Sequence, residues 1–189
     1  MREKNKKVQV IAGSAKGRKL KVPHKSRPIT NRAKASLFSI LGSDIKNKRI
    51  LDLFAGSGAL GIEALSRGAK SCTFVDKNKF TISDIKANLE KTGFADISVT
   101  IRQGIFYFLD ETPYESYDII FVDPPFGFFD SPSKVKRIMT ITSQILTEKG
   151  GLIFKHPKSF SFPEIKTLIE ADSRNFGAST VTIWVKKTK

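Results

Sequence analysis

The chain has 189 residues and more basic than acidic side chains, 33 against 18, which gives a formal net charge of +15. This length favours a single domain, and no apolar run reaches the roughly 18 residues of a membrane-spanning helix. The single cysteine, Cys72, excludes an internal disulfide and is typical of a reducing cytoplasm, and two histidines with one cysteine exclude the usual zinc ligand sets.

Basic residues gather at the amino end of the chain. Residues 1–34 hold twelve basic residues and one acidic residue. The runs 8–12 and 18–22 flank a glycine-containing turn and predict a β-hairpin. We expect residues 1–28 to be a basic hairpin and linker that binds nucleic-acid phosphates, although a solubilising basic face is the alternative. The expected phosphate-binding residues are Lys16, Arg18, Lys19, Lys21, Arg27 and Arg32; Arg32 could instead point into the site or to solvent.

The rest of the chain alternates strands with helices. Thr30 is the predicted N-cap of a helix that ends near Leu41, before Gly42. The alternation that follows is typical of βαβ units and predicts an α/β fold with a mostly parallel sheet. Strands are predicted at 49–54, 71–76, 98–102, 117–122, 151–155 and 180–185, and helices at 58–67, 78–92, 105–109, 132–147 and 164–171.

A glycine-rich turn follows the first of these strands. Gly56, Gly58 and Gly61 match the G-x-G-x-x-G pattern, and Asp76 ends the next strand at a spacing typical of a carboxylate that binds a ribose. The pattern favours an adenosine-containing cofactor, with a purely structural loop as the alternative. Asp52 precedes the loop, where it would attract an amine and repel phosphates. S-adenosylmethionine therefore fits better than a dinucleotide.

The segment from Asp123 to Phe126, D-P-P-F, follows the strand at 117–122. Carboxyl ends of parallel strands are where α/β sheets bind ligands. The two prolines remove backbone donors and leave carbonyl acceptors, and an aromatic ring comes next. This turn suits a planar base with an exocyclic amine, although a strand-ending turn capped by Asp is the bland alternative.

The same segments resemble a known family, the bacterial guanine-N2 methyltransferases of 16S ribosomal RNA of the RsmD type. The resemblance implies a Rossmann-like class I methyltransferase domain at 29–189. That domain would have a seven-stranded, mostly parallel sheet with helices on both faces, behind an RNA-binding hairpin. The resemblance covers residues 8 to about 156. The motifs that carry it are V-I-A-G at 10–13, G-R-K-L at 17–20, R-P-I-T-N-R at 27–32, L-F at 37–38, L-D-L-F-A-G-S-G-A-L-G-I-E-A-L-S-R-G-A at 51–69 and F-V-D-P-P-F at 121–126.

The resemblance also implies roles for particular residues. Asp123, Pro124 and Phe126 would hold the target guanine, in 16S rRNA of an assembling small subunit, with a monomer as the default state. Two positions depart from the family pattern: Gln103 and Lys155 stand where acidic residues are common. The cofactor S-adenosylmethionine, which leaves as S-adenosylhomocysteine, would lie on Asp52, Phe54, Gly56, Gly58, Asp76, Gln103 and Thr30.

Two other functions remain open from the sequence. D-P-P-F alone also allows adenine-N6 methylation of DNA or RNA. The departures at Gln103 and Lys155 allow a nucleic-acid-binding module whose cofactor site is inactive. His156, which precedes a proline at a strand end, is interpreted as structural. Phe128 and Phe129 would either cover the base or anchor the loop.

Overall fold

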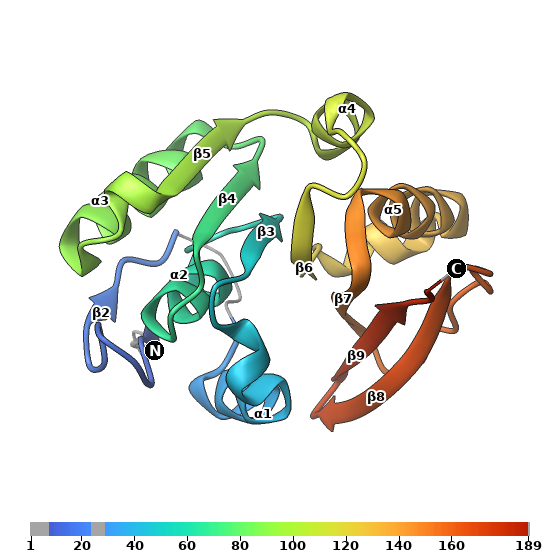
Figure 1. The fold of residues 1–189 in the computed structure, drawn as a ribbon, viewed down its shortest axis with the longest axis horizontal. Coiled ribbons are helices and arrows are strands. Elements are labelled where there is room, and N and C mark those ends of the chain that lie inside the picture. Colours follow the sequence, from blue (N-terminus) through green and yellow to red (C-terminus); the bar gives the residue numbers. More distant parts are fainter. Residues whose placement is uncertain (1–7, 24–28, 189) are drawn as a thin grey trace, which may run out of the picture.

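The computed structural model describes residues 8–23 and 29–188. Its main sheet has seven strands in the order β5-β4-β3-β6-β7-β9-β8 (Figure 1). The first five are parallel, and β9 runs antiparallel to both β7 and β8. The Rossmann-like α/β prediction is confirmed. The sheet strands are β3 (Arg49–Leu53), β4 (Ser71–Asp76), β5 (Ser98–Arg102), β6 (Tyr117–Val122), β7 (Leu146–Pro157), β8 (Leu168–Phe176) and β9 (Ser179–Lys186).

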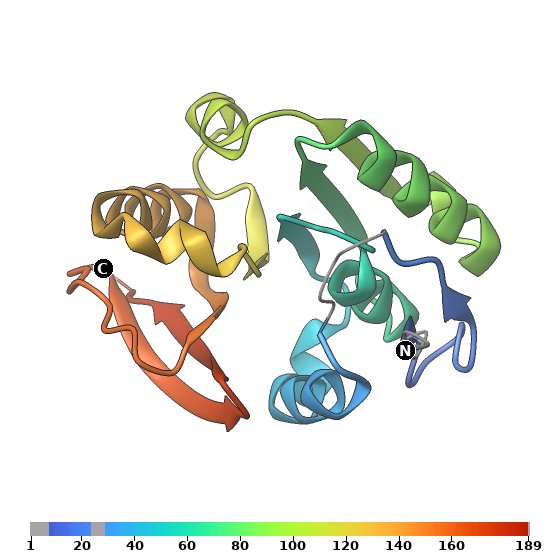
Figure 2. The ribbon, with the colours of Figure 1, turned by 180° about the vertical axis from the view of Figure 1, so that it is seen from behind.

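Helices cover both faces of the sheet (Figures 1 and 2). Side chains alternate between the faces along each strand. Ile50, Phe74 and Phe121 therefore join a core cluster with α1, α2 and α3, while Leu51 and Val122 join a second cluster with α4 and α5. The helices are α1 (Asn31–Leu41), α2 (Ala59–Ser66), α3 (Lys79–Thr92), α4 (Ile105–Glu111) and α5 (Pro132–Ile145), with short 3-10 turns η1 (Gly42–Ile45), η2 (Ala95–Ile97) and η3 (Phe126–Asp130).

The largest error of the sequence-based prediction lies near the carboxyl end. The predicted helix at 164–171 is wrong, because the chain there leads into the edge strand β8. Its segment contains helix-favouring Glu, Lys, Leu and Ala, and Leu168 is the one buried residue of the strand. A strand so exposed shows no clear alternation, and its conformation comes from pairing with β9. The residue pattern alone accordingly predicts six of the seven strands, whereas the seven-stranded sheet that the family resemblance implies is confirmed.

Other boundaries agree more closely. The hydroxyl of Thr30 accepts a hydrogen bond from the Ala33 N–H at 3.2 Å, which confirms the predicted cap of α1, and the helix ends before Gly42. The helix predicted at 132–147 ends at Ile145. Strand β7 begins at Leu146, earlier than predicted, because that buried residue already pairs with β6.

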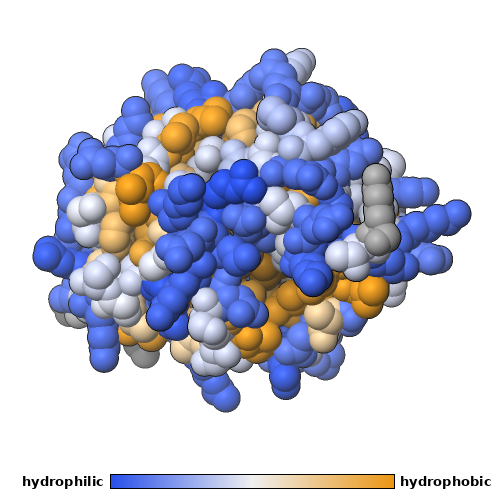
Figure 3. Space-filling view, in the orientation of Figure 1, coloured by the Kyte–Doolittle hydropathy of each residue, from blue (hydrophilic) through white to orange (hydrophobic). Residues whose placement is uncertain are grey.

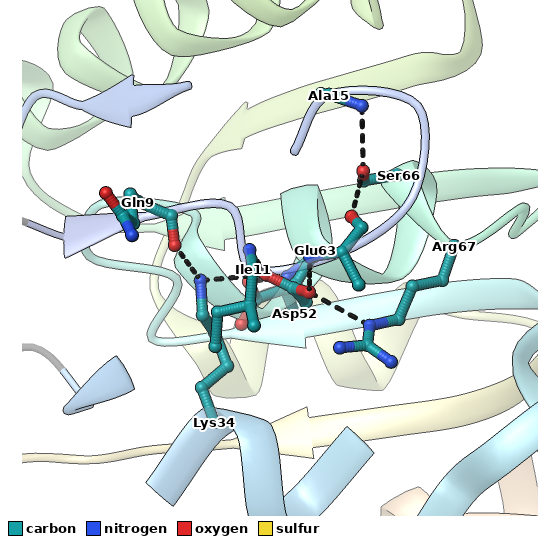
Figure 4. Close-up of polar contacts among 10 residues, drawn as sticks. Gln9, Ile11, Ala15, Lys34, Asp52, Glu63, Ser66 and Arg67 are labelled. Carbon is teal, nitrogen blue, oxygen red and sulfur yellow. Dashed lines mark hydrogen bonds and ion pairs between the residues drawn. The ribbon is translucent and has the colours of Figure 1, made fainter. Parts of the chain in front are cut away.

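The amino-terminal segment packs on α2. Its strands β1 (Val8–Gln9) and β2 (Lys19–Leu20) pair antiparallel, so the predicted hairpin is present but shorter. Figure 4 shows the polar contacts that hold it. Glu63 of α2 accepts the N–H groups of Ile11 and Ala12, at 2.8 and 3.1 Å. Lys34 is fully buried and binds both Glu63, at 3.0 Å, and the Gln9 carbonyl, at 2.7 Å.

The surface in Figure 3 is mostly hydrophilic and is interrupted by hydrophobic patches. Within the described residues, no helix has the length and apolar character needed to cross a membrane.

Candidate active site

A cavity of about 600 Å³ lies at the carboxyl ends of β3 and β6. These two strands are neighbours in the sheet although β4 and β5 lie between them in sequence, so the strand order reverses between them. Open α/β sheets bind ligands at such a switch point. The lining residues are Ile29, Thr30, Ala33, Asp52, Phe54, Ala55, Gly56, Ser57, Ala59, Leu60, Asp123, Pro124, Pro125, Phe126, Lys155, Phe176, Ala178, Ser179 and Val181.

Three carboxylates end neighbouring strands on one face of the sheet. Asp52 and Asp76 follow Ile50 and Phe74 by two residues, and Asp123 follows Phe121 by two, so all three share the face of α1 and α2. Asp52 is 2% exposed and accepts the N–H of Gly61 at 3.0 Å. Burial raises the pKa of Asp52 well above its usual range; the Gly61 hydrogen bond opposes this, and the charges of Asp123 and Asp76 add to it. A cation bound in the cavity would offset the free-energy cost of a charged Asp52 at this buried position.

The loop after β3 opens its backbone toward the cavity. Gly56 has a φ of +55°, and a side chain added there would meet only the Phe54 carbonyl, at 3.8 Å, so its Cα faces open space. Phe54 also has a positive φ, +56°, which is uncommon for a bulky residue and typical of functional sites. Gly61 has a different role: a Cβ there would lie 2.3 Å from the Phe74 ring, so α2 packs directly on β4.

Three of the predicted cofactor residues lie outside the set of described residues that line the cavity. Gly58 has a φ of +72° and is the N-cap of α2, packed against Ile62 and Phe74. Asp76 accepts the N–H of Gly56 at 3.3 Å and that of Asn78 at 2.9 Å. The Gln103 side-chain amide donates to Glu111 at 3.3 Å. Asp76 thus borders the loop directly, and Gln103 follows the next strand outward.

Asp123 is paired with a residue whose role the sequence left open. The Lys155 ammonium lies 2.7 Å from Oδ1 of Asp123, and both side chains are 19% exposed. Burial raises the pKa of Asp123, and the charge and hydrogen bond of Lys155 oppose that shift. A carboxylate acceptor, a proline carbonyl and a phenylalanine thus share one cavity with the glycine loop.

Comparison with known proteins identifies the family of this chain. The profile of the family described as Conserved hypothetical protein 95 matches residues 8–185. The chain belongs to this family, the RsmD-type methyltransferases. It is 35% identical to YlbH of Bacillus subtilis, provisionally named an rRNA methyltransferase, over 95% of this chain and 100% of that protein. It is 37% identical to ribosomal RNA small subunit methyltransferase D of Escherichia coli, over 77% of this chain and 69% of that protein. The solved structure of yhhF from Escherichia coli, provisionally named a methyltransferase, matches with a TM-score of 0.83 and 27% identity, over 97% of this chain and 99% of that one.

The aromatic residues after D-P-P have two roles in this RsmD-type chain. Phe126 lines the cavity and is 45% exposed, so its ring is available at the mouth. Phe128 and Phe129 anchor the loop. Phe128 packs edge-on against Phe54 with ring centroids 5.3 Å apart, and Phe129 is buried against Phe160. Phe54 of the glycine loop therefore touches the η3 turn, which begins at Phe126.

His156 is structural in this RsmD-type chain, as predicted. Its ring bonds the Pro157 carbonyl and the Thr182 hydroxyl, each at 2.9 Å, on the sheet face opposite the cavity. Burial lowers the pKa of His156, which the bond to Pro157 opposes, so the neutral ring is favoured.

One wall of the cavity was missed from the sequence. β8 contributes its last residue, Phe176, the turn after it contributes Ala178, and β9 adds Ser179 and Val181. No local pattern marks these residues as part of a site, since only the antiparallel return of β9 beside β7 brings them there.

The predicted RNA-binding residues of this RsmD-type chain differ in their surroundings. Lys16, Arg18 and Lys19 are exposed on the hairpin. Lys21 forms an ion pair with Asp84 of α3 at 2.7 Å. Arg32 is exposed in the first turn of α1 and lies outside the described cavity lining. Arg27 falls outside the described residues.

Proposed function

We propose that this chain transfers a methyl group from S-adenosylmethionine to the exocyclic N2 amine of a guanine in small-subunit ribosomal RNA. One observation carries the proposal: a single cavity joins Asp52 and the glycine loop to Asp123, Pro124 and Phe126. A cofactor on the first group and a base on the second would meet inside it. The relatives named as small-subunit rRNA methyltransferases support the substrate class.

The residues present fit this cofactor. S-adenosylmethionine would supply an electrophilic methyl group on a positively charged sulfonium, together with a ribose and an amino group but no phosphate. Asp52 is buried and acidic, Gly56 leaves open space beside its Cα, and Asp76 borders the same loop. Carboxylates at this position bind hydroxyls and ammonium groups and repel phosphates. Asp52, Phe54, Gly56 and Thr30 would hold the cofactor inside the cavity, with Asp76, Gln103 and the Gly58 turn beside it.

The segment Asp123 to Phe126 would hold the target base. The amine lone pair of guanine is delocalised into the ring, so nitrogen becomes a better nucleophile as it pyramidalises. The Asp123 carboxylate and the Pro124 carbonyl would accept hydrogen bonds from the two amine hydrogens and favour that geometry. As the N–C bond forms and the S–C bond breaks, the nitrogen becomes acidic, and the Asp123 carboxylate would take up the proton that it releases. Phe126 would stack on a base taken out of its RNA context. Alignment of amine and methyl inside the cavity supplies much of the rate.

We also propose that residues 1–28 act as the RNA-binding part and residues 29–189 as the catalytic part, on 16S rRNA within an assembling subunit. The exposed Lys16, Arg18 and Lys19 support this role of the hairpin. Adenine-N6 methylation is the second candidate, because D-P-P-F is compatible with either amine. Mass spectrometry of nucleosides after reaction separates N2-methylguanosine from N6-methyladenosine.

Asp52→Asn should weaken cofactor binding while it stabilises the fold. Asparagine keeps an acceptor for Gly61 N–H but removes a buried charge. Loss of a charged hydrogen bond worth about 1.5–3 kcal/mol predicts at least about tenfold weaker binding of S-adenosylhomocysteine by calorimetry. The melting temperature of the unliganded protein should rise by about 2–4 °C for each kcal/mol of relieved burial cost. Unchanged affinity would remove Asp52 from the cofactor site.

Neutralising the hairpin should reduce the salt dependence of RNA binding. The variant carries Lys16→Gln, Arg18→Gln and Lys19→Gln. Because each phosphate contact contributes about 0.7–0.9 to the slope of log affinity against log salt, the slope should flatten by about 2–3.

The matched control for the hairpin variant removes three exposed lysines elsewhere. Its substitutions are Lys136→Gln on α5, Lys149→Gln on β7 and Lys187→Gln just after β9. The slope of log affinity against log salt should be the same for this control variant as for the native protein. Equal flattening in both variants would mean that overall charge, and not the hairpin, attracts the RNA.

A further inference from the structure

Lys155 is the one basic residue among the described residues that line the cavity. Its ammonium lies 2.7 Å from Oδ1 of Asp123. The other ionisable side chains of that lining are acidic, Asp52 and Asp123. The base-binding site described above assigns no task to this lysine.

The strand register places Lys155 where it is. β6 and β7 are parallel neighbours, with Phe121 opposite Ile153 and Val122 opposite Phe154, so Asp123 and Lys155 follow at matching positions. Ile153 belongs to the core cluster of the cavity face, and Lys155 lies two residues further on the same face. The next residue, His156, is held on the opposite face by Thr182. The ammonium is therefore directed at Asp123 by the backbone and does not reach it from a flexible loop.

The electrical surroundings of Asp123 explain why a cation matters there. The two strands that flank β6 contribute one charged cavity residue each, Asp52 from β3 and Lys155 from β7. The residues that α1 and the β8–β9 turn add to the cavity lining are uncharged. Without the lysine, a carboxylate at 123 would be largely buried near a second carboxylate, Asp52, a situation that favours its protonated form.

We propose that Lys155 is a positioning residue: it binds Oδ1 of Asp123, keeps the carboxylate ionised and directs Oδ2 to the hydrogen of the substrate amine. Among the described residues, Oδ1 has Lys155 as a partner and Oδ2 has none. A protonated Asp123 would present a donor to an amine that also donates, and the two would not bind. This inference rests on the proposed function of the cavity.

Substitution of Lys155 separates this role from a purely structural one by its pH dependence. Lys155→Met removes the charge, and Lys155→Arg keeps it. Single-turnover methyl transfer to rRNA should fall in Lys155→Met on the acidic side and recover as pH rises. The ratio of rates at about pH 8.5 and about pH 6 should exceed the native ratio, by up to about tenfold for each unit by which the pKa of Asp123 rises. Lys155→Arg should keep the native profile.

A structural lysine would give another result. Its loss would lower the rate by the same factor at every pH, and such a parallel profile would overturn the proposal. Lys155→Gln serves as a second charge-removing variant if the methionine variant does not fold. Combining Lys155→Met with Asp123→Asn gives a further check, because a lysine that acts through the carboxylate should add no pH-dependent loss once that carboxylate is gone.

A second measurement does not depend on turnover. Carbon NMR of protein labelled at aspartate carboxyl groups follows the titration of Asp123, assigned by its absence in Asp123→Asn. The resonance should titrate at higher pH in Lys155→Met than in the native protein and in Lys155→Arg. An unchanged titration would overturn the role of Lys155 even if the enzyme methylates RNA. Absence of methylated RNA with the native protein would instead overturn the proposed function.

Discussion

Lys34→Met should lower the free energy of unfolding by about 3–5 kcal/mol, because it leaves a buried carboxylate without one of its cations. Lys34 and Glu63 are both fully buried, and their charged atoms lie 3.0 Å apart. Burial lowers the pKa of Lys34, and the charge of Glu63 opposes that shift. The variant also strips the Gln9 carbonyl of its donor, so the hairpin loses a second contact to the main domain.

Urea unfolding measures this effect against two other variants. Lys86→Met removes an exposed lysine of α3 and should stay within about 0.5 kcal/mol of the native protein. Lys34→Met combined with Glu63→Gln should be more stable than Lys34→Met alone, because a neutral amide replaces a buried carboxylate that has lost one of its two cations. A loss below about 1 kcal/mol for Lys34→Met would show that Arg67, 2.9 Å from Glu63, and the backbone N–H groups already satisfy the carboxylate.

Asp123→Ala should lower the rate of methyl transfer by about 10²–10⁴-fold, the range of a well-placed proton acceptor. The side chain removed is the one carboxylate that lines the cavity at the carboxyl end of β6. Binding of S-adenosylhomocysteine should be retained, since Asp52 and the glycine loop are unchanged.

Asp123→Asn should lower the rate of methyl transfer less than Asp123→Ala does. Asp123→Asn keeps one acceptor oxygen and the shape of the side chain, so its rate should lie between those of the native protein and the alanine variant. Single-turnover rates and calorimetric binding, measured on the same preparations, separate chemistry from cofactor binding. Near-native turnover by Asp123→Ala would exclude the assigned role of this carboxylate.

The residues that were predicted correctly share a local signal. Strand β3, its glycine loop and α2 are contiguous, and each residue type follows from what its neighbours require: Gly56 a positive φ, Gly61 close packing on β4. The cap at Thr30 and the D-P-P-F turn are also short-range features. Such motifs place the glycine loop and the D-P-P-F turn at the strand ends that line the cavity, without any knowledge of the sheet order.

The features that were missed depend on contacts distant in sequence. The edge strand β8 takes its conformation from pairing with β9, and its exposed residues show no period of two. The pairing of Lys155 with Asp123 needs the register of β6 against β7, which separates the two residues by 32 positions. The anchoring of the hairpin by Glu63 likewise joins residues about fifty positions apart.

The most direct test of the central claim is methyl transfer to small ribosomal subunits that lack the modification. Native protein, Asp123→Ala and buffer are incubated with these subunits and methyl-labelled S-adenosylmethionine, and the RNA is digested to nucleosides for mass spectrometry. We predict labelled N2-methylguanosine from 16S rRNA with the native protein and none above buffer with Asp123→Ala. Label in N6-methyladenosine, or no labelled nucleoside from a native protein that binds the cofactor, would contradict this account.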